Sequence, residues 1–309
     1  MRALLTGASS FTGFWFASSL HAAGLDVVAP LRSAPPKYEG VRRERVQKLA
    51  AKATIVPDCA FGSSGFLDLV SRHKFDVLCH HAARVTDYRS PNFDVVQALV
   101  ENTKNIREIL GAMLPNGLKA VVLTGSVFEA DEGAGNRPMR AFSPYGLSKG
   151  LTSEMIRYWC MHFGIPFGKF VIANPFGPFE EQRFCAYLIN SWRAGEIAEV
   201  RTPAYLRDNI HVDLLAATYA DYVTKTVQTG HAETYGPMGY VETQGAFTQR
   251  YASAMRPRLG WDCSVKLLDQ TDFSEPLARI NTHPVDVAAL GWSEPAAWDR
   301  IAEFYRERP

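Results

Sequence analysis

The chain has 309 residues, with 33 basic and 32 acidic side chains. This length allows one large or two modest domains, and we expect two unequal lobes. The balanced charge gives no summed field that would favour nucleic acid or an acidic membrane surface, so a small-molecule partner is expected. The five cysteines are scattered without a CxxC pair, as in a reduced compartment. Neither a signal peptide nor an apolar run of about 20 residues is recognisable, so we expect a cytoplasmic protein without a membrane segment.

Short apolar, β-rich runs alternate with helical stretches through the first half of the chain. Helices are expected at Thr12–Ala23, 92–113 and 144–163, the last with Ser143 as its cap and Gly164 as its stop. Six strands with helical crossovers predict an α/β fold, a doubly wound parallel sheet of the Rossmann type. These strands are expected at 2–5, 26–31, 53–56, 76–80, 120–124 and 168–173.

The pattern changes after about residue 174, where proline, glycine and aromatic residues become denser. We therefore expect residues 1–173 to form the Rossmann domain. Residues 174–309 should form mainly a smaller C-terminal substrate-binding lobe, interleaved with the first and closed by a helix at Pro295–Arg306.

The stretch "TGASSFTG" follows the first strand and opens the first helix. Gly7 permits a tight turn, and amides at the helix start can bind a pyrophosphate, so this context predicts a dinucleotide-binding turn. Ser10 stands where a third glycine would complete the pattern, and a plain turn is the alternative. The residues expected to contact the cofactor are Gly7, Ser9, Ser10, Phe11, Thr12 and Gly13, with the amide or hydroxyl of Ser10 facing its phosphates.

The end of the second strand bears on which cofactor is bound. NAD-preferring enzymes usually place a carboxylate there to bond the ribose hydroxyls, but this chain has Leu31, Arg32 and Ser33. Arg32 therefore favours NADP slightly over NAD, and the alternative is that Arg32 is a solvated loop residue.

Tyr145 and Lys149 lie four residues apart on one expected helix, so their side chains emerge on the same face. A nearby ammonium favours the phenolate form of a tyrosine, which can then exchange a proton with a substrate hydroxyl or carbonyl. Upstream, "VVLTGSVFE" places Thr124 and Ser126 at the carboxyl edge of the sheet. A strand-end hydroxyl followed by Tyr and Lys on the next helix is a triad for hydride transfer.

With these motifs the chain resembles the extended short-chain dehydrogenases/reductases, in the NAD-dependent epimerase/dehydratase branch that acts on nucleotide sugars. The resemblance runs through the whole chain and rests on motifs in the family's order. They are "TGASSFTG", "HHAARV", "YGLSK", "NPFGP" (174–178), "RDNIHVDLLA" (207–216) and "LGW" (290–292).

The resemblance implies roles for individual residues. Tyr145 would be the general acid/base, and Lys149 would bind the nicotinamide ribose and lower the pKa of the tyrosine. Thr124, three residues before "VF", matches the catalytic hydroxyl and would contact substrate, with Ser126 as the alternative. Arg207 and Asn174 resemble the residues that hold the substrate diphosphate. Further cofactor contacts implied by position are Asp58, His81, Ala82 and Ala83.

Other positions narrow the prediction. The family's dehydratases carry an Asp-Glu pair where this chain has Gly125 and Ser126, so we do not expect dehydration. His80 and His81 are adjacent on a strand and point to opposite faces, so no metal site is expected. Members of the family commonly dimerise through two helices, which 92–113 and 144–163 match, so a homodimer is expected.

The sequence therefore predicts an enzyme that transfers hydride between NAD(P) and a carbon of a nucleotide sugar. A 4-epimerase is narrowly favoured over an NADPH-dependent 4-keto-sugar reductase. A reductase of non-sugar carbonyls and a non-catalytic NADP-binding redox sensor are further alternatives.

Overall fold

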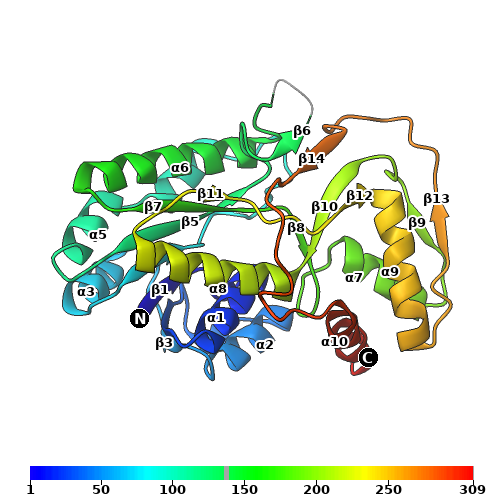
Figure 1. Ribbon diagram of the computed structural model, residues 1–309, viewed down its shortest axis with the longest axis horizontal. Helices are drawn as coiled ribbons and strands as arrows, with labels where there is room; N and C mark the ends of the chain where they lie inside the picture. Colours follow the sequence, from blue (N-terminus) through cyan, green and yellow to red (C-terminus); the bar gives the residue numbers. More distant parts are fainter. Residues whose placement is uncertain (136–138, 309) are drawn as a thin grey trace. The chain divides into compact units, whose positions relative to one another are not determined.

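The computed structural model describes residues 1–135 and 139–308, and the chain divides into two compact units (Figure 1). Unit 1 comprises 1–132, 139–172 and 216–236. Unit 2 contains β6 (Ala134–Gly135), 173–215 and the chain from 237 onward. The chain thus leaves unit 1 after Glu132, Ile172 and Gly236, and returns to it at Met139 and Ala216.

Unit 1 is built on a seven-stranded parallel sheet that contains all six expected strands. The order β3-β2-β1-β4-β5-β7 is that of a doubly wound Rossmann fold, and β11 adds a seventh strand at the edge. The strands are β1 (Arg2–Thr6), β2 (Asp26–Pro30), β3 (Thr54–Val56), β4 (Val77–His80), β5 (Ala120–Ser126), β7 (Phe167–Ile172) and β11 (Thr234–Tyr235).

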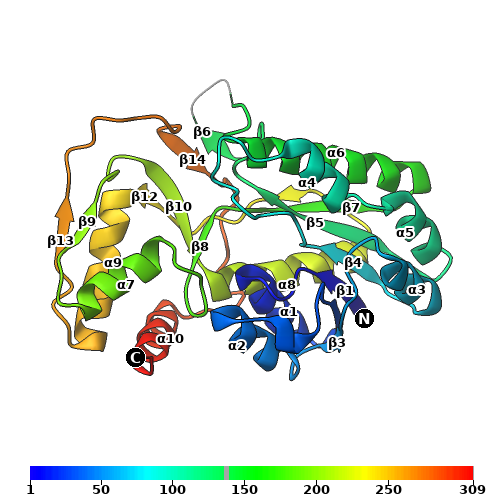
Figure 2. The same ribbon diagram turned by 180° about the vertical axis from the view of Figure 1, so that it is seen from behind.

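Helices cover both faces of this sheet (Figures 1 and 2). One face carries α1 (Phe11–Ala22), α2 (Gly40–Leu49) and α8 (Val212–Thr229). The ring of Phe16 on α1 stacks on that of Tyr219 on α8, with 3.9 Å between the ring centres. The other carries α3 (Ser64–Arg72), α4 (Val95–Asn102), α5 (Ile106–Met113) and α6 (Pro144–Phe163). The apolar core beneath α3, α5 and α6 includes Phe66, Ile109 and Ile156.

The prediction of a single helix at 92–113 is wrong, because α4 and α5 are separate helices. Asn105 has a left-handed backbone (φ 54°) that ends helical continuity, and its side-chain amide donates to the Gly62 carbonyl at 2.9 Å. Helices α2 and α3 were not predicted, although Ser63 caps α3 and Phe66 and Val70 form its buried face. The short 3-10 helix η1 (Pro35–Lys37) lies in the proline-rich segment after β2.

Helix α6 begins and ends where the sequence indicates. The Ser143 hydroxyl accepts the Gly146 amide at 3.2 Å, and Gly164 ends the helix with φ 67°. Gly146 lies against the Phe128 carbonyl so closely that a Cβ would clash with it. This contact fixes the first turn of α6, which carries Tyr145.

Unit 2 has its own sheet and core. The strand order in its main sheet is β12 (Tyr240–Thr243), β10 (Leu206–His211), β14 (Ala278–Ile280) and β6. Strand β8 (Asn174–Phe176) lies outside this order and pairs with β10. A second small sheet joins β9 (Ala198–Val200) to β13 (Val265–Leu267). Helices α7 (Phe184–Arg193), α9 (Gln244–Leu259) and α10 (Glu294–Arg306) surround an aromatic core. Within the described residues, no helix is long and apolar enough to cross a bilayer.

Candidate active site

The turn between β1 and α1 has the geometry of a pyrophosphate-binding loop. Gly7 has φ 74°, and a Cβ there would lie 2.8 Å from the Ala82 amide nitrogen. A Cβ on Gly13 would clash with the Gly7 carbonyl, so both positions require glycine. Among the described residues, the chain offers no acceptor to the amides of Phe11 and Thr12 in the first turn of α1. These amides, at the positive end of the helix dipole, fit a phosphate.

Ser10 is bound within the loop. Its amide donates to the Gly7 carbonyl at 3.0 Å, and its hydroxyl accepts the Gly13 amide at 3.1 Å as the cap of α1. The same hydroxyl lies 3.1 Å from His81 Nε2, so the side chain faces the residue directly after β4. The amide and hydroxyl of Ser10 are thus both bonded within the chain, which argues against the expectation that one of them faces the cofactor phosphates. A serine in place of the middle glycine therefore gives α1 a cap and joins the loop to His81.

His81 links the glycine loop to the candidate catalytic strand. Its Nε2 lies 2.9 Å from the Thr12 hydroxyl, and its Nδ1 lies 3.0 Å from the Thr124 hydroxyl. Burial, followed by the charges of Lys149 and His80, lowers the pKa of His81 to about 3. His81 is therefore neutral, and it accepts at one ring nitrogen and donates at the other.

His80 points to different neighbours, as expected for adjacent strand residues. Its Nδ1 lies 3.1 Å from the Thr6 hydroxyl and its Nε2 lies 3.0 Å from the Asn102 carbonyl. Burial and the Lys149 charge lower the pKa of His80 to about 3. The Thr6 hydroxyl also accepts the amides of His81 and Ala82, which fixes the backbone after β4.

Lys149 is almost fully buried, and its Nζ donates to the Thr124 carbonyl at 2.6 Å. Burial lowers the pKa of Lys149 to about 8, with Glu129 opposing the shift and Lys169 adding to it. Tyr145, one turn earlier on α6, packs its ring edge-on against Tyr88, Phe93 and Phe128. This arrangement places the Tyr145 ring among aromatic side chains, one helical turn before the buried Lys149.

The two candidate hydroxyls at the end of β5 differ in their surroundings. Thr124 is 3% exposed and meets His81. Ser126 is half-buried, and its hydroxyl accepts the Phe128 amide at 3.2 Å in the following turn. Only Thr124 is joined to the glycine loop through His81.

The loops after β2 and β3 form the part of unit 1 where the adenosine ribose of a dinucleotide would lie. Asp58 accepts the Ala34 amide at 3.1 Å, which ties the two loops together. Arg32 is exposed. Arg42 of α2 reaches the glycine loop instead, donating to the Ser9 hydroxyl from Nε at 3.2 Å and from Nη2 at 2.8 Å.

Arg42 also lies over the Tyr38 ring, 5.1 Å from its centre, and the Tyr38 hydroxyl accepts the Ser33 amide at 3.4 Å. In the described chain no carboxylate pairs with Arg42. Sequence reasoning missed Arg42, because nothing in a helix separated from the glycine loop by about 30 residues indicates that its side chain returns to that loop.

In unit 2, the candidate diphosphate ligands occupy neighbouring strands. Asn174 lies opposite Asn209 in the β8–β10 register, and its side-chain amide donates to the Asp208 carbonyl at 3.2 Å. Arg207 is paired with Glu275 at 2.8 Å and donates to the Pro276 carbonyl at 3.0 Å. The guanidinium is therefore oriented by the segment before β14, and Glu275 occupies the kind of position that an anionic ligand would take.

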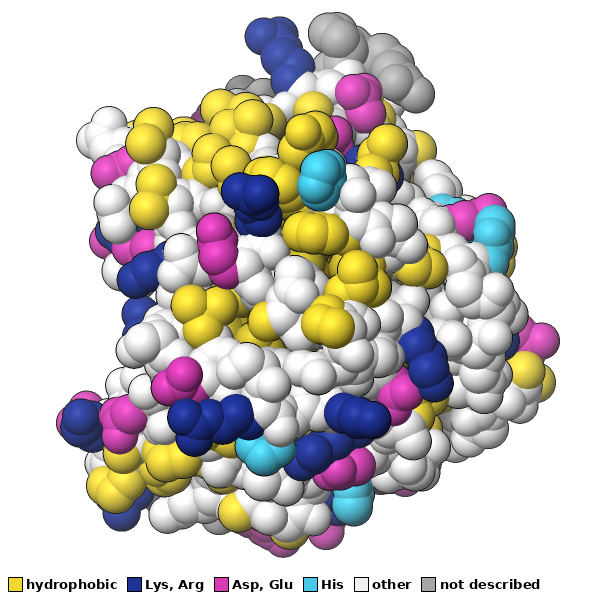
Figure 3. Space-filling view, turned by 90° about the vertical axis from the view of Figure 1, so that its left-hand side faces the viewer, with side chains coloured by type: hydrophobic (Ala, Val, Ile, Leu, Met, Phe, Trp, Pro, Cys, Tyr) yellow, Lys and Arg dark blue, Asp and Glu magenta, His cyan; other side chains and the backbone are white. Residues whose placement is uncertain are grey.

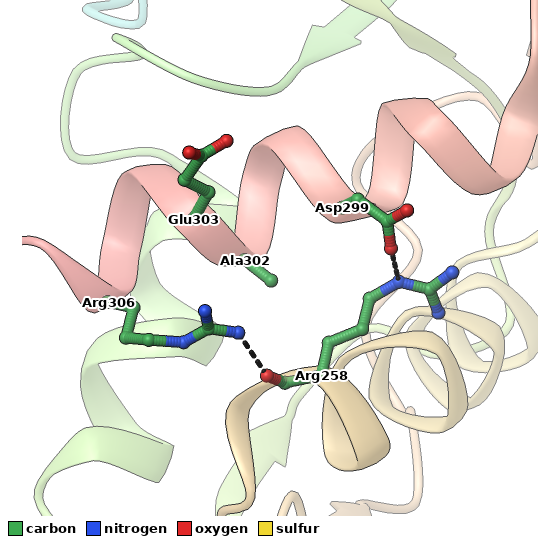
Figure 4. Close-up of a pocket in the computed structure, with 5 residues that line it drawn as sticks. All are labelled: Arg258, Asp299, Ala302, Glu303 and Arg306. Carbon is green, nitrogen blue, oxygen red and sulfur yellow. Dashed lines mark hydrogen bonds and ion pairs between the residues drawn. The ribbon is translucent and has the colours of Figure 1, made fainter.

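A separate hollow in unit 2 lies between α9 and α10 (Figure 4), with a volume of about 300 Å³. Arg258 bonds Asp299 at 2.7 Å across it, and the Arg258 carbonyl accepts from Arg306 at 2.5 Å. No candidate site residue is among those that line it, which are Arg258, Asp299, Ala302, Glu303 and Arg306.

The Rossmann sheet, the glycine turn and the Thr-Tyr-Lys set together define a dinucleotide-binding fold of the short-chain dehydrogenase/reductase type. The model of the NAD dependent epimerase/dehydratase family matches residues 3–244, and the chain belongs to this family. No curated protein sequence matches the chain.

Solved structures resemble the chain over nearly its whole length. The UDP-glucuronic acid 4-epimerase from Bacillus cereus, in complex with UDP-glucuronic acid and NAD, is 16% identical (TM-score 0.74, 99% of each chain). The dTDP-glucose 4,6-dehydratase from Streptomyces venezuelae, with NAD bound, is 18% identical (TM-score 0.71, 100% of this chain and 98% of that one). The UDP-glucose 4-epimerase from Thermotoga maritima is 17% identical (TM-score 0.71, 99% of each chain). At these identities the likeness establishes the fold.

The neutral state of His81 gives a testable pH dependence of stability. Between pH 3 and 6.5 the unfolded chain binds a proton at this position and the folded chain does not, so His81 makes stability rise with pH over that range. In His81→Leu, the slope of unfolding free energy against pH should be smaller by about 1.4 kcal/mol per pH unit near pH 5.

Urea unfolding at several pH values measures this slope. His231→Leu is the control, because it also removes an imidazole but from an exposed position outside the buried strand ends. Equal slopes for wild type and His81→Leu would show that folded His81 takes up a proton normally.

Proposed function

We propose that the chain is an NADPH-dependent reductase that delivers hydride to a keto carbon of a nucleotide sugar. The observation that carries this choice is Arg42, a guanidinium without a carboxylate partner in the described chain, which reaches the glycine loop at Ser9. A cation at the ribose favours a 2′-phosphate, whereas NAD-preferring folds use a carboxylate there. A cofactor that is consumed and exchanged suits a reductase. The site therefore supports the reductase over the 4-epimerase that the sequence narrowly favoured.

The residues present fit this cofactor. The open amides of Phe11 and Thr12 would hold the pyrophosphate, and Ser9 with Arg42 would hold the 2′-phosphate. Ala82, Ala83 and Lys149 would lie along the nicotinamide half, as the family resemblance implies. When bound, NADPH supplies the hydride that the carbonyl carbon of the substrate accepts.

The protein's own groups would handle the proton. Tyr145 would donate its phenolic proton to the carbonyl oxygen as the carbon accepts hydride, so that the products are the alcohol and NADP⁺. The Lys149 ammonium favours the resulting phenolate. If His81 carries its proton on Nδ1, it donates to Thr124 and leaves the threonine hydroxyl proton for the substrate oxygen. Arg207 and Asn174 would bind the diphosphate.

A 4-epimerase is the second candidate. The same triad can oxidise a sugar carbon and return the hydride to its other face, and the solved structures named above include 4-epimerases crystallised with NAD or with a nucleotide sugar. Dehydration is not proposed, because Gly125 and Ser126 replace the two carboxylates that elimination needs.

Turnover assays with NADPH and a panel of nucleoside diphosphate 4-keto sugars test the proposal. Tyr145→Phe should lower kcat by about 100-fold or more, because the proton donor is lost. Arg207→Ala should cripple turnover through a raised KM, whereas Arg250→Ala is the control, since Arg250 pairs with Glu242 on the same unit. If Tyr145→Phe alters no measured activity, the redox-sensor alternative gains. Isomerisation without net NADPH oxidation would identify an epimerase.

Cofactor choice is tested without substrate. Wild type should bind adenosine 2′,5′-bisphosphate at least about 10-fold more tightly than 5′-AMP, because a charge-assisted pair contributes about 1.5–3 kcal/mol. Arg42→Ala should remove this preference, and calorimetric titration measures it. Arg43→Ala, an exposed neighbour on α2, is the matched control. Equal affinities for both nucleotides in wild type would overturn the NADP assignment.

We further propose that unit 1 pairs with a second copy through α4 and α6, as the family resemblance implies. Val96 and Val100 of α4 are exposed, as are Leu147, Leu151 and Tyr158, which recur at helical spacing on α6. Figure 3 shows hydrophobic side chains gathered on the face that includes the end of α6. Exposed apolar side chains that recur on one helix face are typical of an interaction surface.

Light scattering after gel filtration tests this pairing. Wild type should have about twice the chain mass at micromolar concentration, and Leu151→Glu should be monomeric because it buries a charge in the interface. His73→Glu, a surface change beyond the end of α3, should leave the mass unchanged. A monomeric wild type would exclude the dimer.

A further inference from the structure

Three ionisable side chains that the proposed mechanism does not use lie together inside unit 1. Lys169 of β7 is 4% exposed, and its Nζ lies 2.5 Å from Glu129 Oε2 and also contacts Glu132. Glu129 is 1% exposed, and its other oxygen accepts the Ser126 amide at 2.7 Å. Burying charges is costly unless they are paired, and such a cluster is weak evidence for stability. The position of the cluster in the fold is therefore a better guide to its role than its effect on stability.

The cluster lies at the catalytic end of β5. Lys169 is opposite Leu123 in the β5–β7 register, next to Thr124, whose carbonyl accepts from Lys149. A Cβ on Gly125 would lie 2.7 Å from Lys169 Cε and 3.1 Å from Glu129 Oε1. The glycine at the position of the dehydratase aspartate thus leaves the space that Lys169 and Glu129 fill.

Charges within this region balance. The charge of Lys169 neutralises one of the two carboxylates, those of Glu129 and Glu132. The negative charge that remains can balance the ammonium of Lys149. The carboxylate of Glu129 raises the pKa of Lys149, against the stronger lowering by burial, and Lys169 lowers it further. Among the described residues, other titratable groups around Lys149 and Thr124 include Tyr145 on α6, Tyr219 on α8 and the histidines His80 and His81 at the end of β4. Both histidines are neutral at pH 7, because their pKa values are lowered to about 3.

We propose that Glu129 is a positioning residue for catalysis, the counter-ion that keeps Lys149 protonated in its buried site, and that Lys169 and Glu132 hold Glu129 in place. This inference rests on the proposed function only for its catalytic consequence. Without Glu129, Lys149 would lose its proton at lower pH, and Tyr145 would lose the ammonium that favours its phenolate.

Two variants with opposite expected effects test the proposal. Glu129→Gln keeps the side-chain shape and removes the anion, so the Lys149 titration should move down by about one pH unit or more. The double variant Lys169→Met/Glu132→Gln removes one charge of each sign and leaves Glu129 in place. Because the repelling cation is gone, the Lys149 titration should move up. Glu132→Gln alone is the matched control and should move it less than Glu129→Gln does.

The titration is measured by NMR of protein labelled with ¹³C-lysine, with the Lys149 signal assigned from Lys149→Met. This measurement needs no substrate, so it stands apart from the proposed function. In turnover assays the alkaline limb of kcat/KM should shift with the NMR titration, while the affinity for adenosine 2′,5′-bisphosphate should not change. A Lys149 titration that is the same in wild type and Glu129→Gln, or that moves in the same direction in both variants, would overturn the inference.

Discussion

The candidate catalytic end of unit 1 depends on one buried ammonium group, that of Lys149. An uncompensated charge in the interior would be expelled or neutralised, so its neighbours must accommodate it. The Thr124 carbonyl accepts its hydrogen bond at 2.6 Å, and its charge helps to keep His80 and His81 neutral. The Glu129–Lys169–Glu132 cluster supplies the balancing negative charge. The hydrogen bond of the Thr124 carbonyl, the neutral state of two histidines and the buried ion pair on β7 thus all surround this lysine.

The glycine loop illustrates how a departure from a motif can be absorbed. Ser10 replaces the middle glycine, and its hydroxyl caps α1 and meets His81. His81 then extends the connection to Thr124. The phosphate-binding turn and the candidate catalytic strand are therefore joined by side-chain hydrogen bonds as well as by the β1–β4–β5 backbone ladder.

The features expected of the family and the surroundings of the candidate site contribute separately to the structure. The family features are the Rossmann sheet, the glycines Gly7 and Gly13, and the helix that carries Tyr145 and Lys149. Two further residues shape the candidate site: Arg42 brings a cation to the glycine loop, and Gly125 leaves room that the buried ion pair of Lys169 and Glu129 occupies. We propose that the first favours NADPH and that the second leaves elimination without one of its carboxylates.

The sequence by itself determined the six strands, the ends of α6, the glycine turn and the positions of Thr124, Tyr145 and Lys149. These depend on local patterns: apolar runs, caps at Ser143 and Gly164, and side chains four apart on a helix. The break between α4 and α5 was missed because the left-handed turn at Asn105 is stabilised by a distant carbonyl, that of Gly62. Only the tertiary structure brought Arg42 to Ser9, His81 to Thr124, and Lys169 to Glu129. Each of these contacts joins separate elements, because parallel strands and their helices place side chains from distant segments at one sheet edge, and no local spacing encodes which of them meet.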